Sequence, residues 1–106
     1  MITIRLFCAA GMSTGILVDR MKKSAKESGL EADIAAAPVA AMEEEADGID
    51  VALLGPQVRY KLEEAKKICG ERKIPVEVIP MIDYGTMNGK NVLDFALRLS
   101  GHKEQQ

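Results

Sequence analysis

The sequence has little of the material from which most catalytic centres are built. Its 106 residues include one histidine, two cysteines and no tryptophan, and aromatic residues make up only 4%. His102 stands in a polar stretch near the end, so a histidine general base or a histidine metal site is not expected. Cys8 and Cys69 are too few for a disulfide framework and lack the paired spacing of zinc ligands. We therefore expect reduced thiols, no bound metal and no cofactor.

Excess charge and long apolar segments are also missing. There are 14 lysine and arginine residues against 16 aspartate and glutamate residues, a formal net charge of -2. This balance argues against the basic surface that nucleic-acid-binding proteins carry. No apolar run approaches the roughly 20 residues that cross a bilayer, and no signal peptide is recognised. These features predict one globular, cytoplasmic domain over residues 1–106.

The apolar residues follow two alternating periodicities along the chain. Short apolar runs predict strands at 2–7, 30–37, 49–54 and 74–79. Spacings of three and four residues predict helices over 13–28, around 42–45, over 58–69 and around 92–97, with a loop at 80–89. Strand 30–37 contains Asp33 and is ended by Pro38, which suits the edge of a sheet.

This alternation of strands and helices predicts an α/β fold. Right-handed crossovers between the strands give a four-stranded parallel sheet with helices on both faces. Ligands of such sheets bind beyond the carboxyl ends of the strands. The loops that begin at Cys8, Gly55 and Pro80 each follow a predicted strand, so we expect them to meet at one edge. A functional site is therefore expected there.

The segment Cys8–Gly15 leaves a predicted strand and enters a predicted helix, as an anion-binding loop does. Backbone N–H groups would point at the centre of the loop, and the helix dipole adds about half a positive charge there. Gly11 and Gly15 permit close approach or a positive φ. Ser13 and Thr14 can cap the helix or donate to a phosphate oxygen. The same field favours the thiolate form of the cysteine, which can then act as a nucleophile without a histidine.

A purely structural interpretation of the same residues is equally open. A cysteine at a strand end is often a small buried hydrophobe, and a Ser-Thr pair before a helix often only caps it. The local sequence around Cys8 does not decide between the two interpretations. Cys69 lies on the apolar face of a predicted helix, outside any such loop, and is expected in the core.

The position six residues after Cys8 is informative about the chemistry. Cysteine-dependent phosphatases have arginine there, which binds phosphate with two hydrogen bonds and stabilises the transition state. Here that position is Thr14. Without the arginine, a phosphoryl group on Cys8 should persist until another acceptor removes it. This favours a phosphoryl carrier over a hydrolase.

Three segments, Leu6–Thr14, Val51–Val58 and Tyr84–Gly85, together resemble one known family over essentially the full chain. It is the IIB component of the bacterial phosphoenolpyruvate-dependent sugar phosphotransferase system (PTS), of the lactose/cellobiose (chitobiose) type. The resemblance implies strand order 2-1-3-4 and a phosphotransferase that accepts phosphate from a histidine of IIA. The acceptor would be a sugar bound by membrane-embedded IIC, a β-linked disaccharide such as cellobiose, chitobiose or lactose. Membrane contact would arise only through IIC.

The resemblance also implies roles for individual residues. Cys8 matches the cysteine that becomes phosphorylated. The loop whose backbone amides bind the phosphoryl group matches Ala9, Ala10, Gly11, Met12, Ser13, Thr14 and Gly15. The neighbouring loops, which shape the site or the docking face, match Gly55, Pro56, Gln57 and Tyr84. Relatives often have serine at position 9, so Ala9 removes one hydroxyl group, and Asp83 receives no catalytic role.

Two other functions are compatible with this scaffold. A cysteine-dependent phosphatase or an arsenate-reductase-like enzyme would use a similar loop, but threonine at position 14 disfavours it. A redox or nucleotide-binding regulator is disfavoured in its redox form because the loop has no second cysteine. Hydrolysis of p-nitrophenyl phosphate tests the first function, and the intact mass of a phosphoryl adduct tests the second. Adjacent genes for IIA and IIC would favour the carrier.

Overall fold

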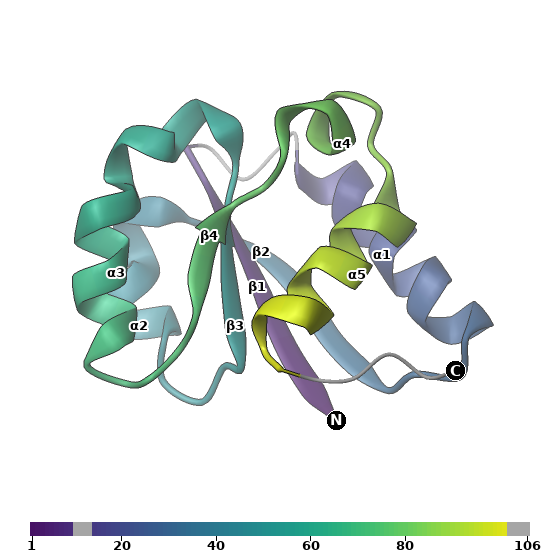
Figure 1. Ribbon diagram of the computed structural model, residues 1–106, viewed down its shortest axis with the longest axis horizontal. Coiled ribbons are helices and arrows are strands. Elements are labelled where there is room, and N and C mark those ends of the chain that lie inside the picture. The colour runs from purple at the N-terminus through teal and green to yellow at the C-terminus, as the bar shows by residue number, and fades with distance from the viewer. Residues whose placement is uncertain (10–13, 102–106) are drawn as a thin grey trace.

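The computed structural model describes residues 1–9 and 14–101. Parallel strands form one sheet in the order β2-β1-β3-β4, with bounds β1 Ile2–Cys8, β2 Ala32–Pro38, β3 Val51–Leu54 and β4 Val76–Val78. The helices are α1 Thr14–Glu27, α2 Met42–Glu45, α3 Leu62–Gly70, α4 Met81–Gly85 and α5 Gly89–Leu99, with 3-10 segments η1 Val39–Ala41 and η2 Pro56–Lys61 (Figure 1). The predicted fold class and strand order are confirmed, and the second strand lies at an edge as expected.

Strand β1 is the centre of the sheet because it pairs on both sides. Phe7 lies opposite Ala37 of β2 and Leu54 of β3, and Cys8 lies opposite Pro38. The carboxyl ends of these three strands are therefore level with one another. Strands β1, β3 and β4 all end at the same edge of the sheet, the upper one in Figure 1. This is the edge at which the sequence predicts a site.

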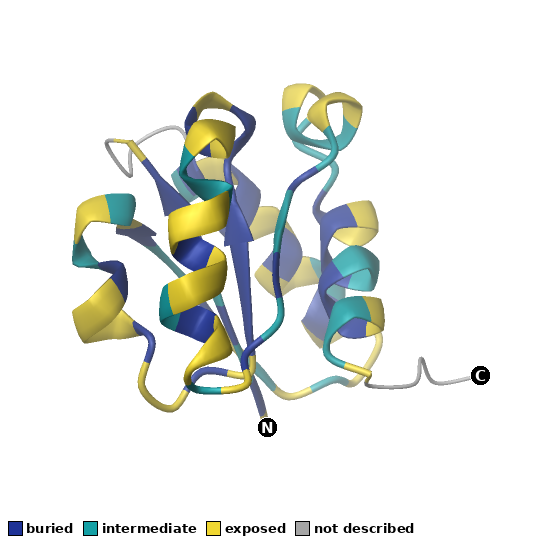
Figure 2. Ribbon diagram, turned by 60° about the vertical axis from the view of Figure 1, so that its left-hand side comes forward, coloured by how far each residue is buried: buried dark blue, intermediate teal, exposed yellow. Residues whose placement is uncertain are grey.

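Helices cover both faces of the sheet, and an aliphatic core lies under each layer. On one face, α1 and α5 pack over Ile4 and Leu6 of β1. On the other face, α2 and α3 pack over Phe7, and Cys69 of α3 is fully buried in that core. This alternation follows from the two-residue period of a strand. Figure 2 shows the buried helix faces turned toward the sheet, and the prediction that Cys69 is a core residue is confirmed.

Several predicted elements have different bounds in the structure. The predicted helix 58–69 begins only at Leu62, because Val58 has a non-helical backbone (φ -116°, ψ 26°) and the chain first forms η2. The predicted loop 80–89 contains the short helix α4. The predicted strand 74–79 shortens to β4 because Pro75 has no N–H, and the N–H of Ile74 donates to the carbonyl of Cys69 at the end of α3.

Helix α4 is tied to the start of α5 by a group of hydrogen bonds. The Asn88 N–H donates to the Asp83 carbonyl at 2.9 Å, and Asn91 Nδ2 donates to Asp83 Oδ1 at 3.0 Å. Asn88 Oδ1 in turn accepts from the Asn91 N–H, which caps α5. Met87, between the two helices, has a left-handed backbone (φ 52°), and its side chain packs against the core under α1 and α5. This junction fixes α4 at the carboxyl edge of the sheet.

Residues 1–9 and 14–101 contain no helix that is both long and apolar enough to cross a membrane. Within the same residues, no three histidine, cysteine, aspartate or glutamate side chains come together as a potential metal site.

Candidate functional site

Cys8 ends the central strand and is almost fully buried, with 1% of its surface exposed. Its Sγ lies 3.2 Å from Oγ1 of Thr14, and either atom can be the donor in this hydrogen bond. Thr14 is the first residue of α1 and has no exposed surface. The two ends of the predicted anion-binding loop therefore meet at the cysteine sulfur. A thiolate at Cys8 would accept this hydrogen bond from the threonine hydroxyl.

The remaining residues of the predicted phosphate-binding loop fall into two groups. Ala9 is described and exposed. Gly15 lies in the first turn of α1, where backbone N–H groups have no partner within the helix. Its φ is not positive, and a Cβ atom on it would meet no described protein atom within 4 Å. The other members, Ala10, Gly11, Met12 and Ser13, lie outside the described residues.

The loop after β3 lies directly beside Cys8. The N–H of Gly55 donates to the Phe7 carbonyl at 2.9 Å, which continues the pairing of β3 with β1. A Cβ atom on Gly55 would lie 3.6 Å from Cβ of Cys8 and would overlap Oε1 of Gln57. Pro56 is buried and begins η2. The Gly55 loop, residues 55–57, thus forms one wall next to the cysteine.

The segment after β4 is connected to this wall by a side-chain hydrogen bond. Gln57 Nε2 donates to the hydroxyl oxygen of Tyr84 at 2.9 Å. Tyr84 lies on α4 and also packs against the core under α1 and α5. Asp83, beside it, accepts the hydrogen bond from Asn91 and so holds α4 to α5. The structure thus brings Cys8, Gly55 and Tyr84 to one edge, as the loop positions predict.

Sequence reasoning missed two of these contacts. It assigned Thr14 to the helix cap or to phosphate, whereas the hydroxyl group contacts the cysteine sulfur directly. It assigned Gln57 and Tyr84 to neighbouring loops without joining them. Both contacts depend on side-chain rotamers across the sheet edge. The only signal in the sequence is that each residue follows a strand whose carboxyl end lies at this edge.

Three exposed apolar side chains belong to the helices α1 and α4, near the ends of these helices that follow β1 and β4. Ile16 is 56% exposed in the first turn of α1, and Met81 and Ile82 are 65% and 75% exposed on α4. Figure 2 shows the outer side of α4 as exposed. Large apolar side chains in water are unfavourable, so Ile16, Met81 and Ile82 are candidates for contact with another protein.

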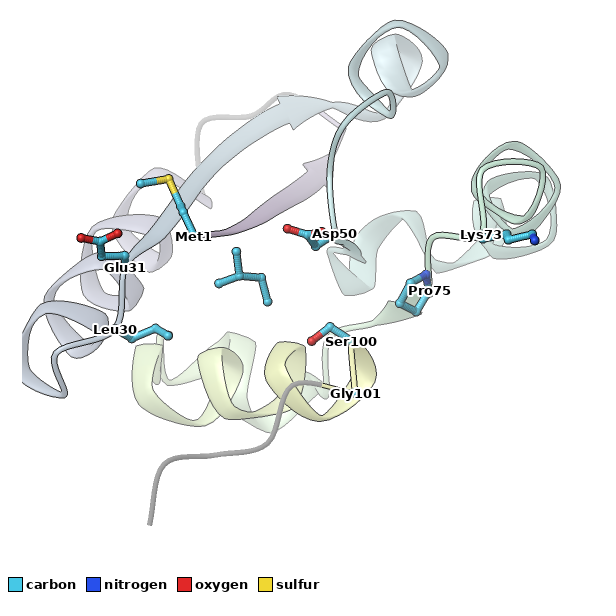
Figure 3. A pocket seen from close by; sticks show the side chains of 9 residues that line it. Met1, Leu30, Glu31, Asp50, Lys73, Pro75, Ser100 and Gly101 are labelled. Atoms are coloured by element: carbon cyan, nitrogen blue, oxygen red, sulfur yellow. The ribbon is translucent and has the colours of Figure 1, made fainter.

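An open pocket lies at the end of the molecule opposite to Cys8. This open pocket of about 700 Å³ is lined by Met1, Leu30, Asp50 and Ser100, among others (Figure 3). These residues precede β1, β2 and β3 or follow α5, so the pocket lies at the amino ends of the strands. It is therefore separate from Cys8 and its neighbours.

The second cysteine has a different environment. Burial raises the pKa of the Cys69 thiol, and the nearby positive charge of Arg72 opposes this rise only in part. Arg72 is itself held by Asp47, whose carboxylate accepts a 2.7 Å hydrogen bond that raises the pKa of the guanidinium. A buried thiol with a raised pKa is a poor nucleophile at neutral pH. Cys69 is therefore not expected to act as the nucleophile of this site.

The fold and the site together define a class of protein. It is a small α/β domain with a buried thiol at the carboxyl end of its central strand. The family described as "PTS system, Lactose/Cellobiose specific IIB subunit" matches residues 3–95. The chain belongs to this family and is therefore a phosphotransferase component that works with other components of a sugar phosphotransferase system.

Curated relatives and solved structures agree with this assignment. The galactose-specific EIIB component of Lactococcus lactis subsp. cremoris is 43% identical over 101 residues, covering 91% of this chain and 94% of the relative. The oligo-beta-mannoside-specific EIIB component of Bacillus subtilis is 40% identical over 96 residues, covering 91% and 93%. The solution structure of a cellobiose-specific IIB component from Borrelia burgdorferi has a TM-score of 0.79 at 41% identity, covering 99% and 96%. A lactose-specific IIB domain from Streptococcus pneumoniae shares the fold, with a TM-score of 0.84 at 18% identity over 92% and 96%.

Proposed function

We propose that this protein carries a phosphoryl group on Cys8, which it accepts from a phosphohistidine of IIA and passes to a sugar bound by membrane-embedded IIC. The observation that carries this proposal is the 3.2 Å contact between Cys8 Sγ and Thr14 Oγ1 at the carboxyl end of β1, in a chain of the IIB family. That contact places the thiol at the start of α1, where the helix dipole favours negative charge.

Both transfers are displacements at phosphorus. In the first, the Cys8 sulfur attacks the phosphorus, the S–P bond forms and the P–N bond to the IIA histidine breaks. The proton that the thiol gives up ends on the leaving imidazole. In the second, a sugar hydroxyl oxygen attacks, the O–P bond forms and the S–P bond breaks, so Cys8 leaves as a thiolate. The hydroxyl proton goes to a base on IIC or to water.

Thr14 and the start of α1 act on the charge that these steps move. Negative charge develops on the sulfur as the thiol gives up its proton in the first displacement and when Cys8 leaves in the second, and the Thr14 hydroxyl can donate to the sulfur in both steps. The phosphoryl oxygens need donors at every stage. The proposed donors are the backbone N–H groups of the loop and first turn, those of Ala9, Ala10, Gly11, Met12, Ser13, Thr14 and Gly15. Positioning and charge stabilisation supply most of the catalysis in phosphoryl transfer.

Hydrolysis is the reaction that a carrier must avoid. A cysteine phosphatase uses an arginine at the position occupied here by Thr14, a short neutral side chain that contacts the sulfur. The phosphocysteine of the proposed carrier is therefore stable against hydrolysis by water, and the carrier does not hydrolyse p-nitrophenyl phosphate. Turnover of that substrate at Cys8 would favour the phosphatase instead.

The partners and the sugar follow from the proposed chemistry. IIA and IIC would both dock on the edge that carries Ile16, Met81 and Ile82, since both must reach the same sulfur. The proposed sugar is a β-linked disaccharide such as cellobiose, chitobiose or lactose, which IIC binds and selects. Two free thiols suit a reducing compartment, so the proposed place of action is the cytoplasm, with membrane contact only through IIC.

Transfer of labelled phosphate from IIA tests this function. Phosphorylated IIA is mixed with the wild-type chain, with Cys8→Ser and with Cys69→Ser, and label on the chain is followed with time. We expect label on wild type and on Cys69→Ser, and none on Cys8→Ser, because Cys69 is buried in the core with a raised pKa. Full labelling of Cys8→Ser would refute the proposal. Chase of the label onto cellobiose in membranes that contain IIC tests the second transfer.

A further inference from the structure

We infer that Gln57 and Tyr84 are a positioning pair, whose hydrogen bond joins the Gly55 loop to α4 and thereby sets the rate of phosphoryl transfer to Cys8. This inference rests on the proposed function of Cys8. It concerns the two walls that flank the thiol, and neither residue of the pair exchanges atoms with the phosphoryl group.

The Gln57 side chain is folded back over Gly55 although the residue is exposed. Its Oε1 lies too close to Gly55 to leave room for a Cβ atom there, and such a Cβ atom would also stand 3.6 Å from Cβ of Cys8. Its Nε2 donates to Tyr84 on the far side, at 2.9 Å. The amide group of Gln57 therefore fills the space between the residue beside Cys8 and the tyrosine. An exposed glutamine gives up rotamer freedom to stay there.

The other partner is held by a helix that needs external support. Helix α4 has five residues, too few for a stable helix by itself. Asp83 holds it to α5 through Asn91, and Arg20 Nη1 donates to the Met87 carbonyl from α1 at 3.2 Å. These bonds support α4 on the side of α1 and α5. The bond from Gln57 supports Tyr84 on the side of the Gly55 loop, 27 residues earlier in the chain.

Accurate placement of these walls matters because the phosphoryl donor arrives on another protein. In-line attack needs the sulfur, the phosphorus and the leaving nitrogen in one line, and a misplacement of about 1 Å can cost about a hundredfold in rate. The surfaces next to Cys8 orient the incoming phosphohistidine. A bond that joins two of these surfaces acts on alignment, so its loss should slow transfer within the docked complex while docking itself changes little.

The test is single-turnover transfer of label from phosphorylated IIA at increasing IIA concentration. It compares wild type with Gln57→Ala, Tyr84→Phe and the double variant, and Thr86→Val is the control because it removes another α4 hydrogen bond, to the Ile82 carbonyl. We expect the plateau rate to fall about tenfold in each single variant, with the half-saturating IIA concentration within about twofold of wild type. The double variant should be no slower than the slower single variant. Thr86→Val should retain the wild-type plateau.

Gly55→Ala tests the same pair without removing either functional group. The glycine has an ordinary extended backbone (φ -63°, ψ 148°), so alanine fits the chain, but its methyl group displaces the Gln57 amide. We expect the same loss of plateau rate as for Gln57→Ala. Gly70→Ala is the matched control, because a Cβ at Gly70 meets nothing within 4 Å. Thermal unfolding of every variant identifies any variant that fails to fold. The plateau rates of the variants that do fold then decide whether the pair positions the site.

The outcomes separate this inference from the function on which it rests. Wild-type plateau rates in Gln57→Ala and Tyr84→Phe would overturn the pair, as would additive losses in the double variant. An increase in the half-saturating concentration with an unchanged plateau would also overturn it, since the pair would then be a docking contact. Failure of the wild-type chain to take label on Cys8 would instead overturn the proposed function.

Discussion

Two residues six positions apart, Cys8 and Thr14, carry the chemistry proposed for this domain. The threonine hydroxyl stands 3.2 Å from the sulfur, in the place of the arginine that a phosphatase would have. An arginine there would stabilise attack by water on a phosphocysteine, whereas a neutral hydroxyl group brings no positive charge to the phosphoryl oxygens. A single side chain thus separates holding a phosphoryl group from hydrolysing it.

Removal of the Thr14 hydroxyl should slow transfer while leaving the fold intact. Hydrogen bonds to charged groups contribute about 1.5–3 kcal/mol, so Thr14→Val should lower the rate of labelling of Cys8 by roughly 10- to 150-fold. Valine fills nearly the same volume at this buried position. Single-turnover labelling from phosphorylated IIA measures the effect. Thr14→Ser keeps the hydroxyl group and should stay near wild type, and a wild-type rate for Thr14→Val would show that the contact has no role in transfer.

At the scale of elements, the packing of α5 against α1 positions the segment that carries Tyr84. Gly89, the first residue of α5, lies against the backbone of α1, where a Cβ atom would stand 2.6 Å from the Met21 nitrogen. Backbone atoms cannot move aside as a flexible side chain can. The close approach of the two helices therefore depends on this glycine.

Gly89→Ala should destabilise the protein by about 1–3 kcal/mol, the usual cost of overpacking. Urea unfolding of the variant and of wild type measures the difference. Gly85→Ala in α4 is the control, because a Cβ there meets nothing within 4 Å, and alanine in a helix is favoured over glycine by up to about 1 kcal/mol. Equal stability of Gly89→Ala and wild type would mean that α5 can shift away from α1 without cost.

The strands and helices differ in how well the sequence predicts them. The strands and the long helices follow from apolar periodicity, and so does the meeting of the three loops at one edge. The start of α3 at Leu62 and the existence of α4 do not, because both depend on local backbone conformations, at Val58 and at Met87, that tertiary packing imposes. The side-chain contacts of Thr14 and Gln57 could not be predicted from the sequence either, since side-chain rotamers at a sheet edge leave no periodic signal in it.

At the scale of the whole molecule, Cys69 should give the stability a dependence on pH. Burial raises its pKa in the folded protein above that in the unfolded chain. Below about pH 8, both states keep the proton, and the effect is absent. As the pH rises through about 8.5, the ordinary thiol value, the unfolded chain loses the proton first, so it binds fewer protons than the folded protein and the free energy of unfolding falls.

Comparison of wild type with Cys69→Ala isolates this dependence. Between about pH 7.5 and 9.5, the free energy of unfolding of wild type should fall more than that of Cys69→Ala, because the raised pKa keeps Cys69 protonated in the folded protein. Urea unfolding at the two pH values, under reducing conditions, provides the measurement. Cys8 is present in both proteins and cancels from the difference. Equal pH dependence in the two proteins would contradict a raised pKa at Cys69.

The pocket at the amino ends of the strands has a practical consequence for attaching this protein to a support. Met1 and Gly101 both line that pocket, at the end of the sheet opposite to Cys8. An anchor coupled near residue 1 would therefore leave the thiol pointing away from the support. A sensor chip prepared in this way would present every molecule with the edge that carries Cys8 toward the solution, where the proposed phosphorylated partner can reach it.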